Sequence, residues 1–353
     1  MDQRKNKIPV AVLGATGAVG QRFVQLLAEH PWFQITALAA SERSSHKRYA
    51  DACGWHLHDP MPVAVRDMPV VPVEPDMDAH IVFSALPVET ARQVEPQFAR
   101  AGYAVCSNTS AFRLDSNVPV IIPEVNADHL ALVKNQKDAY GWEGLLVTSP
   151  NCTTTGFAIP LKPIDMAFGL KKVIAVSMQA VSGAGYPGLS YLDIQDNVIP
   201  GIPGEEEKME RESRALLGRM EGKQRVDADF IISAHSNRVP VSDGHTICLS
   251  LELRSKASIA EIRKLLSDFR SPIFQPHLPS MPRFPIVVRE EPDRPQPHKD
   301  RDAGEGMQVS VGQIRPCPVL DVRMVAVVHN TLRGAAKGAI LNAELLVAEG
   351  LIL

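Results

Sequence analysis

The stretch "IPVAVLGATGAVGQRFVQLLAEHP", residues 8–31, decides the fold that we expect for this chain. It opens with a short apolar run, residues 8–13, that is typical of a buried strand, and it closes as an amphipathic helix that ends at a proline. Between them lie Gly14, Gly17 and Gly20, which let the backbone turn sharply and come close to a pyrophosphate. The stretch therefore predicts a dinucleotide-binding βαβ unit, and a plain tight turn is the alternative.

Strand-like and helix-like segments alternate through the first half of the chain. Apolar runs at 34–41, 80–87 and 103–108 predict strands, and residues 89–101 predict a helix between two of them. Strand alternating with helix is typical of a parallel, doubly wound sheet. We therefore expect an α/β domain of the Rossmann type that ends near residue 150.

The pattern of residues changes after residue 150. Residues 171–185 and 244–255 are longer strand-like runs with polar alternation, and residues 258–270 predict a helix. The Pro-, Asp- and Arg-rich residues 271–306 read as an ordered excursion, because a strand-like run follows them directly. The second half therefore predicts an α+β domain whose sheet has one covered face, and a chain of 353 residues is long enough for two such domains.

Composition and charge argue against several classes of protein. With a net charge of −3, the chain gives no electrostatic reason to expect a nucleic acid or an anionic membrane as its partner. No apolar run approaches the roughly 18 residues of a membrane helix, and the charged first residues do not resemble a secretory signal. Five scattered cysteines argue against a disulfide framework and for a reducing cytoplasm. His56 and His58 have no further ligand cluster to support them, so we expect no metal site.

The end of the second expected strand bears on the choice of cofactor. There the chain reads "AASERSS", residues 39–45. An acidic residue at this position would bind the ribose 2′-hydroxyl of NAD, and Glu42 keeps that possibility open. Ser41, Arg43 and Ser44 offer hydroxyls and a guanidinium, which suit a 2′-phosphate. The loop therefore favours NADP over NAD.

One cysteine stands in a setting that suggests chemistry. Cys152 lies in "VTSPNCTTTG", residues 147–156, just before a segment that could start a helix. A helix N-terminus would lower the pKa of the thiol and donate N–H groups to an oxyanion, whereas a lone buried thiol is usually inert. Cys106 and Cys248 lie in strand-like runs and are expected in the core. Beside a nicotinamide, a thiolate would add to an aldehyde, and loss of hydride would leave a thioester.

Such a reaction also needs a base to move protons. The segment "SAHSNRVPVSDGHT", residues 233–246, offers His235 and His245. His245 follows a turn at the mouth of an expected strand, which is a good place to present a side chain, but either histidine could equally lie on the surface. The residues alone leave the choice between them open.

Taken together, the motifs resemble the aspartate-semialdehyde dehydrogenases, in particular the archaeal and fungal-type branch. The resemblance covers nearly the whole chain and includes "GATGAVGQRF", "SNTSAFR", "IIPEVN", "SPNCTTTG", "QAVSGAGYPG", "GEEEKMERES", "NRVPVSDGHT" and "RGAAKGAILNAELL". It implies a glyceraldehyde-3-phosphate dehydrogenase-like fold. In that fold residues 1–150 and the C-terminal helix 330–353 form the NADP-binding domain, and residues 151–329 form an α+β catalytic and dimerisation domain.

The resemblance also implies an activity. Members of the family carry out the NADP-dependent, reversible reductive dephosphorylation of L-4-aspartyl phosphate to L-aspartate 4-semialdehyde, through a cysteine thioester and with inorganic phosphate as the other product. The reaction belongs to lysine, methionine and threonine biosynthesis. The family forms homodimers or homotetramers, and the sequence does not choose between them.

The resemblance assigns roles to particular residues of this chain. Cys152 matches the nucleophile and His245 the acid/base. The expected substrate-binding residues are Gln179 for the substrate or acyl intermediate, Arg238 for the α-carboxylate, Glu205 for the ammonium, and Arg113 and Lys208 for phosphate. Glu206 and Glu207 adjoin Glu205, so the register of the ammonium-binding glutamate stays open. The expected cofactor-binding residues are Gly14, Thr16, Gly17, Ala18, Val19, Ser41, Arg43, Ser44, Ser84, Leu86, Pro87, Ser182, Gly183 and Asn330.

The terminal segment, residues 330–350, reads as one long helix and contains a departure from the family pattern. The family usually shows "GAAGGA", whereas this chain has Lys337 in "GAAKGA". The lysine would either approach the cofactor or point outward. Two other functions stay open at this point: a malonyl-CoA reductase with the same cysteine and NADPH chemistry, and a nucleotide-sensing protein without catalysis.

Overall fold

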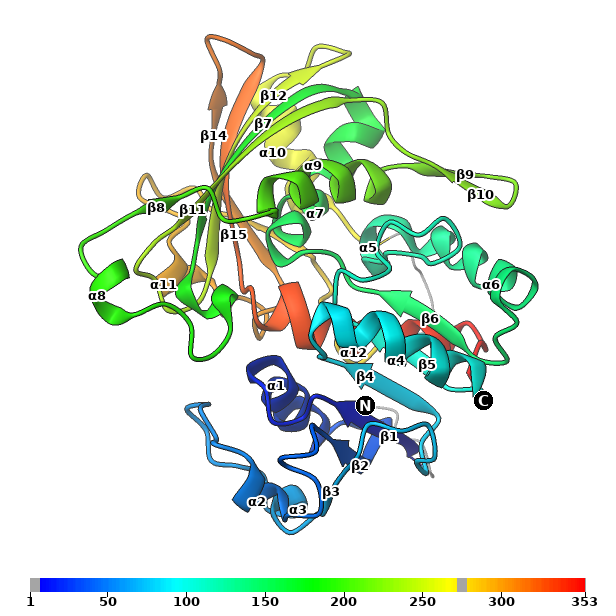
Figure 1. Cartoon of the computed structure of the whole chain (residues 1–353). Helices are drawn as coiled ribbons and strands as arrows, with labels where there is room; N and C mark the ends of the chain where they lie inside the picture. Colours follow the sequence, from blue (N-terminus) through cyan, green and yellow to red (C-terminus); the bar gives the residue numbers. More distant parts are fainter. Residues whose placement is uncertain (1–6, 272–277, 353) are drawn as a thin grey trace.

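The computed structural model describes residues 7–271 and 278–352. The chain forms two lobes, each built on its own sheet (Figure 1). The N-terminal lobe contains a six-stranded sheet in the order β3-β2-β1-β4-β5-β6, with all neighbours parallel. This order is that of a Rossmann-type sheet, so the predicted doubly wound fold is confirmed. The strands are β1 (Ile8–Leu13), β2 (Phe33–Ala39), β3 (Val70–Val71), β4 (Ile81–Ser84), β5 (Ala104–Ser107) and β6 (Leu145–Thr148).

Helices cover both faces of this sheet. Helix α1 (Ala18–Leu27) and the C-terminal helix α12 (Lys337–Ala348) bury apolar side chains against one face, and α4 (Val88–Arg100) buries its own against the other. The end of the chain thus returns to the N-terminal lobe (Figure 1). The other helices of this lobe are α2 (Tyr49–Ala52), α3 (Val63–Arg66), α5 (Pro123–Asn126), the 3₁₀ segment η1 (Ala127–Leu132) and α6 (Val133–Tyr140).

The C-terminal lobe contains a seven-stranded mixed sheet in the order β13-β14-β15-β12-β7-β11-β8. Three helices cover one of its faces, α7 (Cys152–Phe168), α9 (Glu205–Leu216) and α10 (Ile259–Asp268). Burial alternates strictly along β12, as a sheet with one covered face requires. The predicted α+β lobe is therefore confirmed. Its strands are β7 (Leu170–Gln179), β8 (Ile199–Pro200), β11 (Ile231–Arg238), β12 (His245–Leu253), β13 (Ile286–Val288), β14 (Val309–Pro316) and β15 (Val322–Val328).

Smaller elements complete this lobe. The 3₁₀ segment η2 (Val181–Ala184) follows β7, and α8 (Tyr191–Ile194) and α11 (Pro297–Asp300) lie in loops. The hairpin of β9 (Arg219–Glu221) and β10 (Gln224–Val226) extends beyond α9 (Figure 1). The expected excursion at 271–306 contains β13 and α11, while its residues 272–277 lie outside the described part.

Two expectations about local structure are wrong. The terminal segment is not one regular helix, because a π-helical turn, η3 (Leu332–Ala336), precedes α12 and Ala335 has non-helical dihedrals. The turn lies directly against the start of α7: a Cβ on Gly334 would come within 2.6 Å of the Cys152 Cβ. Cys248 is not a core residue, since it lies half-buried on the open face of the sheet, whereas Cys106 is buried as expected.

Within the described residues, no helix combines the length and the apolar character that crossing a bilayer requires.

Candidate active site

A cavity of about 620 Å³ is lined by residues from both lobes. It lies at the carboxyl ends of the strands of the first sheet, where open α/β sheets bind their ligands. The predicted substrate and catalytic side chains that line it are Arg113, Cys152, Gln179, Glu205, Lys208 and Arg238. The predicted cofactor residues that line it are Val19, Leu86, Pro87 and Gly183.

Cys152 is the first residue of α7. The preceding residue, Asn151, caps the helix: its Oδ1 accepts hydrogen bonds from the N–H groups of Thr153 (2.9 Å) and Thr154 (3.1 Å). Asn151 is thus a good N-cap because its side chain satisfies two otherwise unpaired N–H groups. The structure thus places Cys152 at a helix N-terminus, as expected. The Asn151 cap fixes the backbone at this point and with it the direction of the Cys152 side chain.

The pKa of the Cys152 thiol departs from expectation. Burial raises this pKa to about 12, and the carboxylate of Glu205 acts in the same direction. Arg113, Arg238 and the N–H of Thr153 lower it by less. The main-chain N–H at the helix N-terminus lowers this pKa, as expected, but the loss of hydration outweighs it, so the net shift is upward.

His245 is the histidine beside this cysteine. It begins β12, is fully buried, and places its Nε2 3.2 Å from the Cys152 sulfur. Its Nδ1 accepts the N–H of Ala180 at 3.0 Å, so the neutral ring carries its proton on Nε2, toward the sulfur. Burial, then Arg238 and His329, lower the pKa of His245 to about 3, which keeps the ring neutral at pH 7. His235, the alternative, is exposed on β11.

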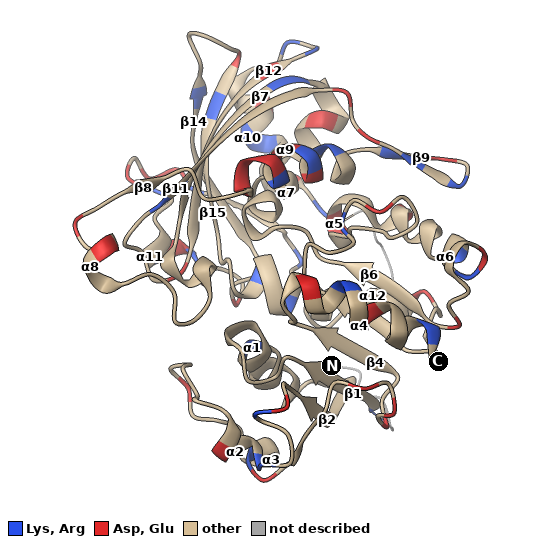
Figure 2. Ribbon diagram, in the orientation of Figure 1, with Lys and Arg blue, Asp and Glu red and all other residues tan. Residues whose placement is uncertain are grey.

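The structure separates the three consecutive glutamates that begin α9, which form the acidic first turn coloured red in Figure 2. Glu205 lines the cavity and accepts hydrogen bonds from Asn151 Nδ2 (2.7 Å) and Gln179 Nε2 (3.1 Å). Glu206 instead accepts the N–H of a β11 residue, and Glu207 pairs with an arginine one turn along the helix. In the described structure Glu205 is therefore the carboxylate that meets the cavity.

Arg238 ends β11 and is buried at the wall of the cavity. Its Nη1 donates to the carbonyl oxygen of Ala180 at 2.7 Å. Gly183 lies so close that a Cβ there would come within 2.7 Å of the same nitrogen and 3.1 Å of the ring of His245. A glycine at this position therefore leaves room for the arginine and the histidine together.

Arg113 follows β5 and brings a second buried guanidinium to the cavity. Its Nη1 forms an ion pair with Glu212 (3.0 Å) and its Nη2 donates to the carbonyl oxygen of Asn108 (2.8 Å). Its Nε is buried without a hydrogen-bond partner among the described residues, whereas Nη1 and Nη2 each have a second N–H that these two bonds do not use. Lys208 lies nearby, with its ammonium 3.8 Å from a Glu205 oxygen.

Glu212 is a functional candidate that the sequence reasoning missed. The sequence analysis assigns Glu212 no role, yet its carboxylate is buried against Arg113. One signal could have found it: it follows Glu205 by seven residues, and two turns of α-helix return to the same face.

The glycine turn is built as a dinucleotide site requires. Gly14 has a φ of 77°, and a Cβ there would come within 2.8 Å of the carbonyl oxygen of Ala85. A Cβ on Gly20 would collide with the carbonyl oxygen of Gly14. Gly17 precedes α1 as its N-cap, with no side chain over the helix end. The turn thus leaves open main-chain space at a helix N-terminus, which fits a dinucleotide pyrophosphate.

The remaining predicted cofactor residues lie at different depths. Thr16 and Ala18 belong to the glycine turn and the start of α1; Ser41, Arg43 and Ser44 follow β2, where Ser41 and Arg43 are exposed. Ser84 is fully buried at the end of β4. Asn330 donates to the Ser182 hydroxyl (2.8 Å) and accepts the N–H of Gly244 (2.8 Å), so it joins η2 to the loop before β12.

Lys337 does not reach the cavity that contains Cys152. Its ammonium lies 2.9 Å from a carboxylate oxygen of Glu305 and 3.2 Å from the carbonyl oxygen of the same residue. With its side chain only 13% exposed, the lysine does not point freely into solvent either, and it pairs with Glu305.

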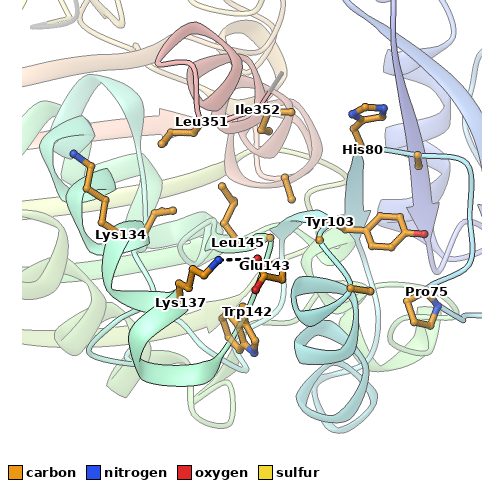
Figure 3. Close-up of a pocket in the computed structure, with 16 residues that line it drawn as sticks. Pro75, His80, Tyr103, Lys134, Lys137, Trp142, Glu143, Leu145, Leu351 and Ile352 are labelled. Carbon is orange, nitrogen blue, oxygen red and sulfur yellow. Dashed lines mark hydrogen bonds and ion pairs between the residues drawn. The ribbon is translucent and has the colours of Figure 1, made fainter.

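A larger cavity, of about 770 Å³, lies elsewhere (Figure 3). It is at the amino ends of β4, β5 and β6, the edge opposite to the one that binds ligands in such sheets, and its walls include Tyr103, Trp142 and Leu351. Lys137 at its rim is paired with Glu143 at 2.8 Å. No cysteine is among the described residues that line this cavity, so size does not mark the active site. No cluster of three or more metal-ligating side chains occurs in the described residues.

Comparisons with known proteins agree with this arrangement. A family model described as "Semialdehyde dehydrogenase, NAD binding domain" matches residues 9–133, and one described as "Semialdehyde dehydrogenase, dimerisation domain" matches residues 161–333. The chain is 50% identical to the aspartate-semialdehyde dehydrogenase of Archaeoglobus fulgidus, over 97% of this chain and 99% of that protein. It is 43% identical to that of Cryptococcus neoformans, over 98% of each chain. Among solved structures, the aspartate semialdehyde dehydrogenase of Candida albicans with NADP superposes with a TM-score of 0.91 at 38% identity, over 98% of this chain and 100% of that one.

Proposed function

This chain belongs to the aspartate-semialdehyde dehydrogenase family, and we propose that it converts L-4-aspartyl phosphate and NADPH reversibly to L-aspartate 4-semialdehyde, phosphate and NADP. The reaction would serve lysine, methionine and threonine biosynthesis. One observation carries the proposal beyond the family likeness. The Cys152 sulfur lies 3.2 Å from the His245 Nε2, in a cavity where a carboxylate and three cations of the expected kinds converge.

Cys152 forms the covalent intermediate in this proposal. The thiol proton passes to water, the resulting thiolate attacks the acyl carbon of aspartyl phosphate, the bond from that carbon to the phosphate oxygen breaks, and phosphate leaves with the electron pair. The product on the enzyme is a thioester. NADPH, when bound, supplies the hydride that reduces this thioester.

His245 is the proposed acid/base partner. The sequence-based mechanism has it accept the thiol proton, but the Ala180 N–H at Nδ1 favours the tautomer with the proton on Nε2. In that form the neutral ring donates a hydrogen bond to an anionic sulfur or to the oxyanion of a tetrahedral intermediate. We therefore propose that its first role is as a donor.

The charged side chains select the substrate. We propose that Arg238 binds the α-carboxylate and Glu205 the ammonium, with Gln179 beside the acyl group. Arg113 and Lys208, which both line the cavity, bind the phosphate. A simple aldehyde would leave these buried charges without partners, so such a site discriminates strongly against it.

The cofactor is proposed to be NADP, held across the glycine turn. Gly14, Thr16, Gly17, Ala18 and Val19 would hold the pyrophosphate. The 2′-phosphate would meet Ser41, Arg43 and Ser44, and the nicotinamide end would lie near Ser84, Leu86, Pro87, Ser182, Gly183 and Asn330. The support is the steric demand for glycine in the turn and the exposed guanidinium after β2.

Domain division and assembly belong to the same proposal. Residues 1–150 with 330–353 form the NADP-binding domain, and residues 151–329 the catalytic and dimerisation domain. We propose a cytoplasmic homodimer or homotetramer that buries the open face of the seven-stranded sheet. That face exposes the apolar side chains of Ile231 (65%) and Ile174 (40%), which a subunit contact would cover.

A substrate assay tests the function. Purified protein is expected to reduce NADP with L-aspartate 4-semialdehyde only when phosphate is present, and to show no NADPH oxidation with malonyl-CoA. Activity with malonyl-CoA alone would instead establish the reductase alternative. None of the relatives or structures described above is a malonyl-CoA reductase.

A further inference from the structure

Glu212 connects two parts of the site through one buried carboxylate. It lies on α9, is 1% exposed, and uses both oxygens. Oε1 accepts from Arg113 Nη1 at 3.0 Å, and Oε2 accepts from the main-chain N–H of Asn151 at 2.6 Å. One partner is a guanidinium that lines the cavity, and the other is the residue immediately before the nucleophile.

The carboxylate holds Arg113 in one orientation. With Nη1 on Glu212 and Nη2 on the Asn108 carbonyl, the guanidinium plane is fixed at two points. Each of these two nitrogens has a second N–H that the two bonds do not use, and Arg113 lines the cavity. A long, flexible side chain held in this way loses little freedom when it binds an anion, which is the general benefit of preorganisation.

The same carboxylate is linked to the start of α7. Asn151 donates its main-chain N–H to Glu212, caps α7 with its Oδ1, and donates from its Nδ2 to Glu205. The two oxygen atoms of Glu212 thus hold both the backbone beside Cys152 and the Arg113 guanidinium in place. A neutral or shorter side chain could not serve both partners, and it would leave Arg113 as an uncompensated buried charge.

We propose that Glu212 is a positioning residue for phosphate, which orients Arg113 at the distance from Cys152 that phosphate release and attack require. The proposal rests on the function proposed above. It concerns Arg113 and the start of α7, so NADP binding should not depend on Glu212.

The test compares Glu212→Gln with Glu210→Gln. Glu210 is on the same helix and accepts a main-chain N–H from Ala234 at 2.9 Å, but it does not line the cavity. We expect Glu212→Gln to raise the KM for phosphate roughly 10- to 100-fold, the loss of one charge-assisted hydrogen bond, with the KM for NADP unchanged. Glu210→Gln should leave both constants near wild type.

Two further measurements separate positioning from general loss of stability. Inorganic phosphate should raise the Tm of the wild type and of Glu210→Gln, but not of Glu212→Gln or Arg113→Ala. In a double-mutant cycle, Glu212→Gln should add little to the phosphate KM of Arg113→Ala, because it acts through that arginine. Should Glu212→Gln not fold, Glu212→Asp keeps the charge, lacks the reach to both partners, and should show the same selective rise.

The outcomes are distinguishable. A phosphate KM within twofold of wild type in Glu212→Gln, or additive effects in the cycle, would overturn the role of Glu212 and leave the proposed function intact. Turnover that is independent of phosphate in the wild type would overturn the proposed function, and this role with it.

Discussion

The glycine turn and the catalytic cavity meet negatively charged ligands by opposite means. The turn offers open main-chain space at the N-terminus of α1, and Gly14 and Gly20 have no room for a side chain. The cavity offers charged side chains, two of which lie near a counter-charge: Arg113 beside Glu212 and Lys208 beside Glu205. The turn depends on the absence of side chains at its glycines, and the cavity depends on the pairing of opposite charges.

This difference determines how each region should fail. Adding one methyl group to the turn creates a collision with main-chain atoms that cannot move away cheaply. Removing one charged group from the cavity causes no collision with the main chain, but it leaves a buried partner without its counter-charge. Substitutions in the two regions should therefore produce different kinetic signatures.

The largest effect should come from the nucleophile. Cys152→Ser keeps the geometry but replaces the thiol with a hydroxyl that is hardly ionised near neutral pH. We expect turnover to fall roughly 1,000-fold or more, with NADP binding by fluorescence titration unchanged. Cys248→Ser, a half-buried thiol on the open face of the sheet, is the control. Wild-type turnover in Cys152→Ser would remove the thioester from the mechanism.

The second largest effect should come from a substitution in the glycine turn. In Gly20→Ala the new Cβ collides with the carbonyl oxygen of Gly14, so the turn must open. We expect NADP affinity, measured by calorimetry, to fall roughly 100-fold or more, a loss above about 3 kcal/mol. Gly54→Ala provides the control, because its nearest neighbour would be at 3.6 Å. Equal affinity in the two variants would contradict the steric account.

Loss of a charged side chain from the cavity should have a somewhat smaller effect. Arg238→Leu removes the proposed partner of the substrate carboxylate, and kcat/KM should fall about 100-fold through both constants. The KM for NADP should stay constant, unlike in Gly20→Ala. Arg211→Leu, an exposed arginine on α9, should behave as wild type. If Arg238→Leu kept wild-type kinetics, the carboxylate would have to bind elsewhere.

These two regions also differ in how far the sequence could predict them. The turn is contiguous, and the steric reason for each glycine is local, so the residues alone indicated it. The cavity joins the ends of β7 and β11 with the starts of β12, α7 and α9. The residues alone indicated Cys152 and offered His235 or His245 as the base, but the substrate-binding members came from the family resemblance, because no spacing rule brings residues 152 and 245 together.

Cys248 and Glu212 show which structural information the sequence patterns contained and which they lacked. Cys248 alternates in phase with Thr246, Ser250 and Glu252, so the polar phase of β12 already placed it on the open face. For Glu212, the helical spacing from Glu205 was visible, but its burial depends on how α9 docks beside Arg113. Phase along one element is local information, whereas docking between distant elements is not.

Burial of the nucleophile should appear as a pH dependence. Because burial raises the pKa of Cys152 to about 12, the thiol form predominates at neutral pH and the thiolate fraction grows tenfold per pH unit. The rate of alkylation by iodoacetamide, with NADP and substrate absent, should thus rise about tenfold per unit from pH 7 to 9. A rate that levels off below pH 8 would show that the helix N-terminus outweighs burial after all.

The smallest effect should come from the exposed rim of the nucleotide site. Arg43 lies in solvent after β2, where an ion pair with a 2′-phosphate is partly screened. Arg43→Ala should therefore raise the KM for NADP only about 5- to 10-fold and leave the KM for NAD unchanged. Lys47→Ala, an exposed cation in the same loop, should change neither constant. The glycine turn and the cavity would then differ in this respect too. Loss of an exposed charge lowers affinity little where the main chain already holds the ligand. A fall in NAD affinity equal to that in NADP would mean that Arg43 binds some part of the cofactor other than the 2′-phosphate.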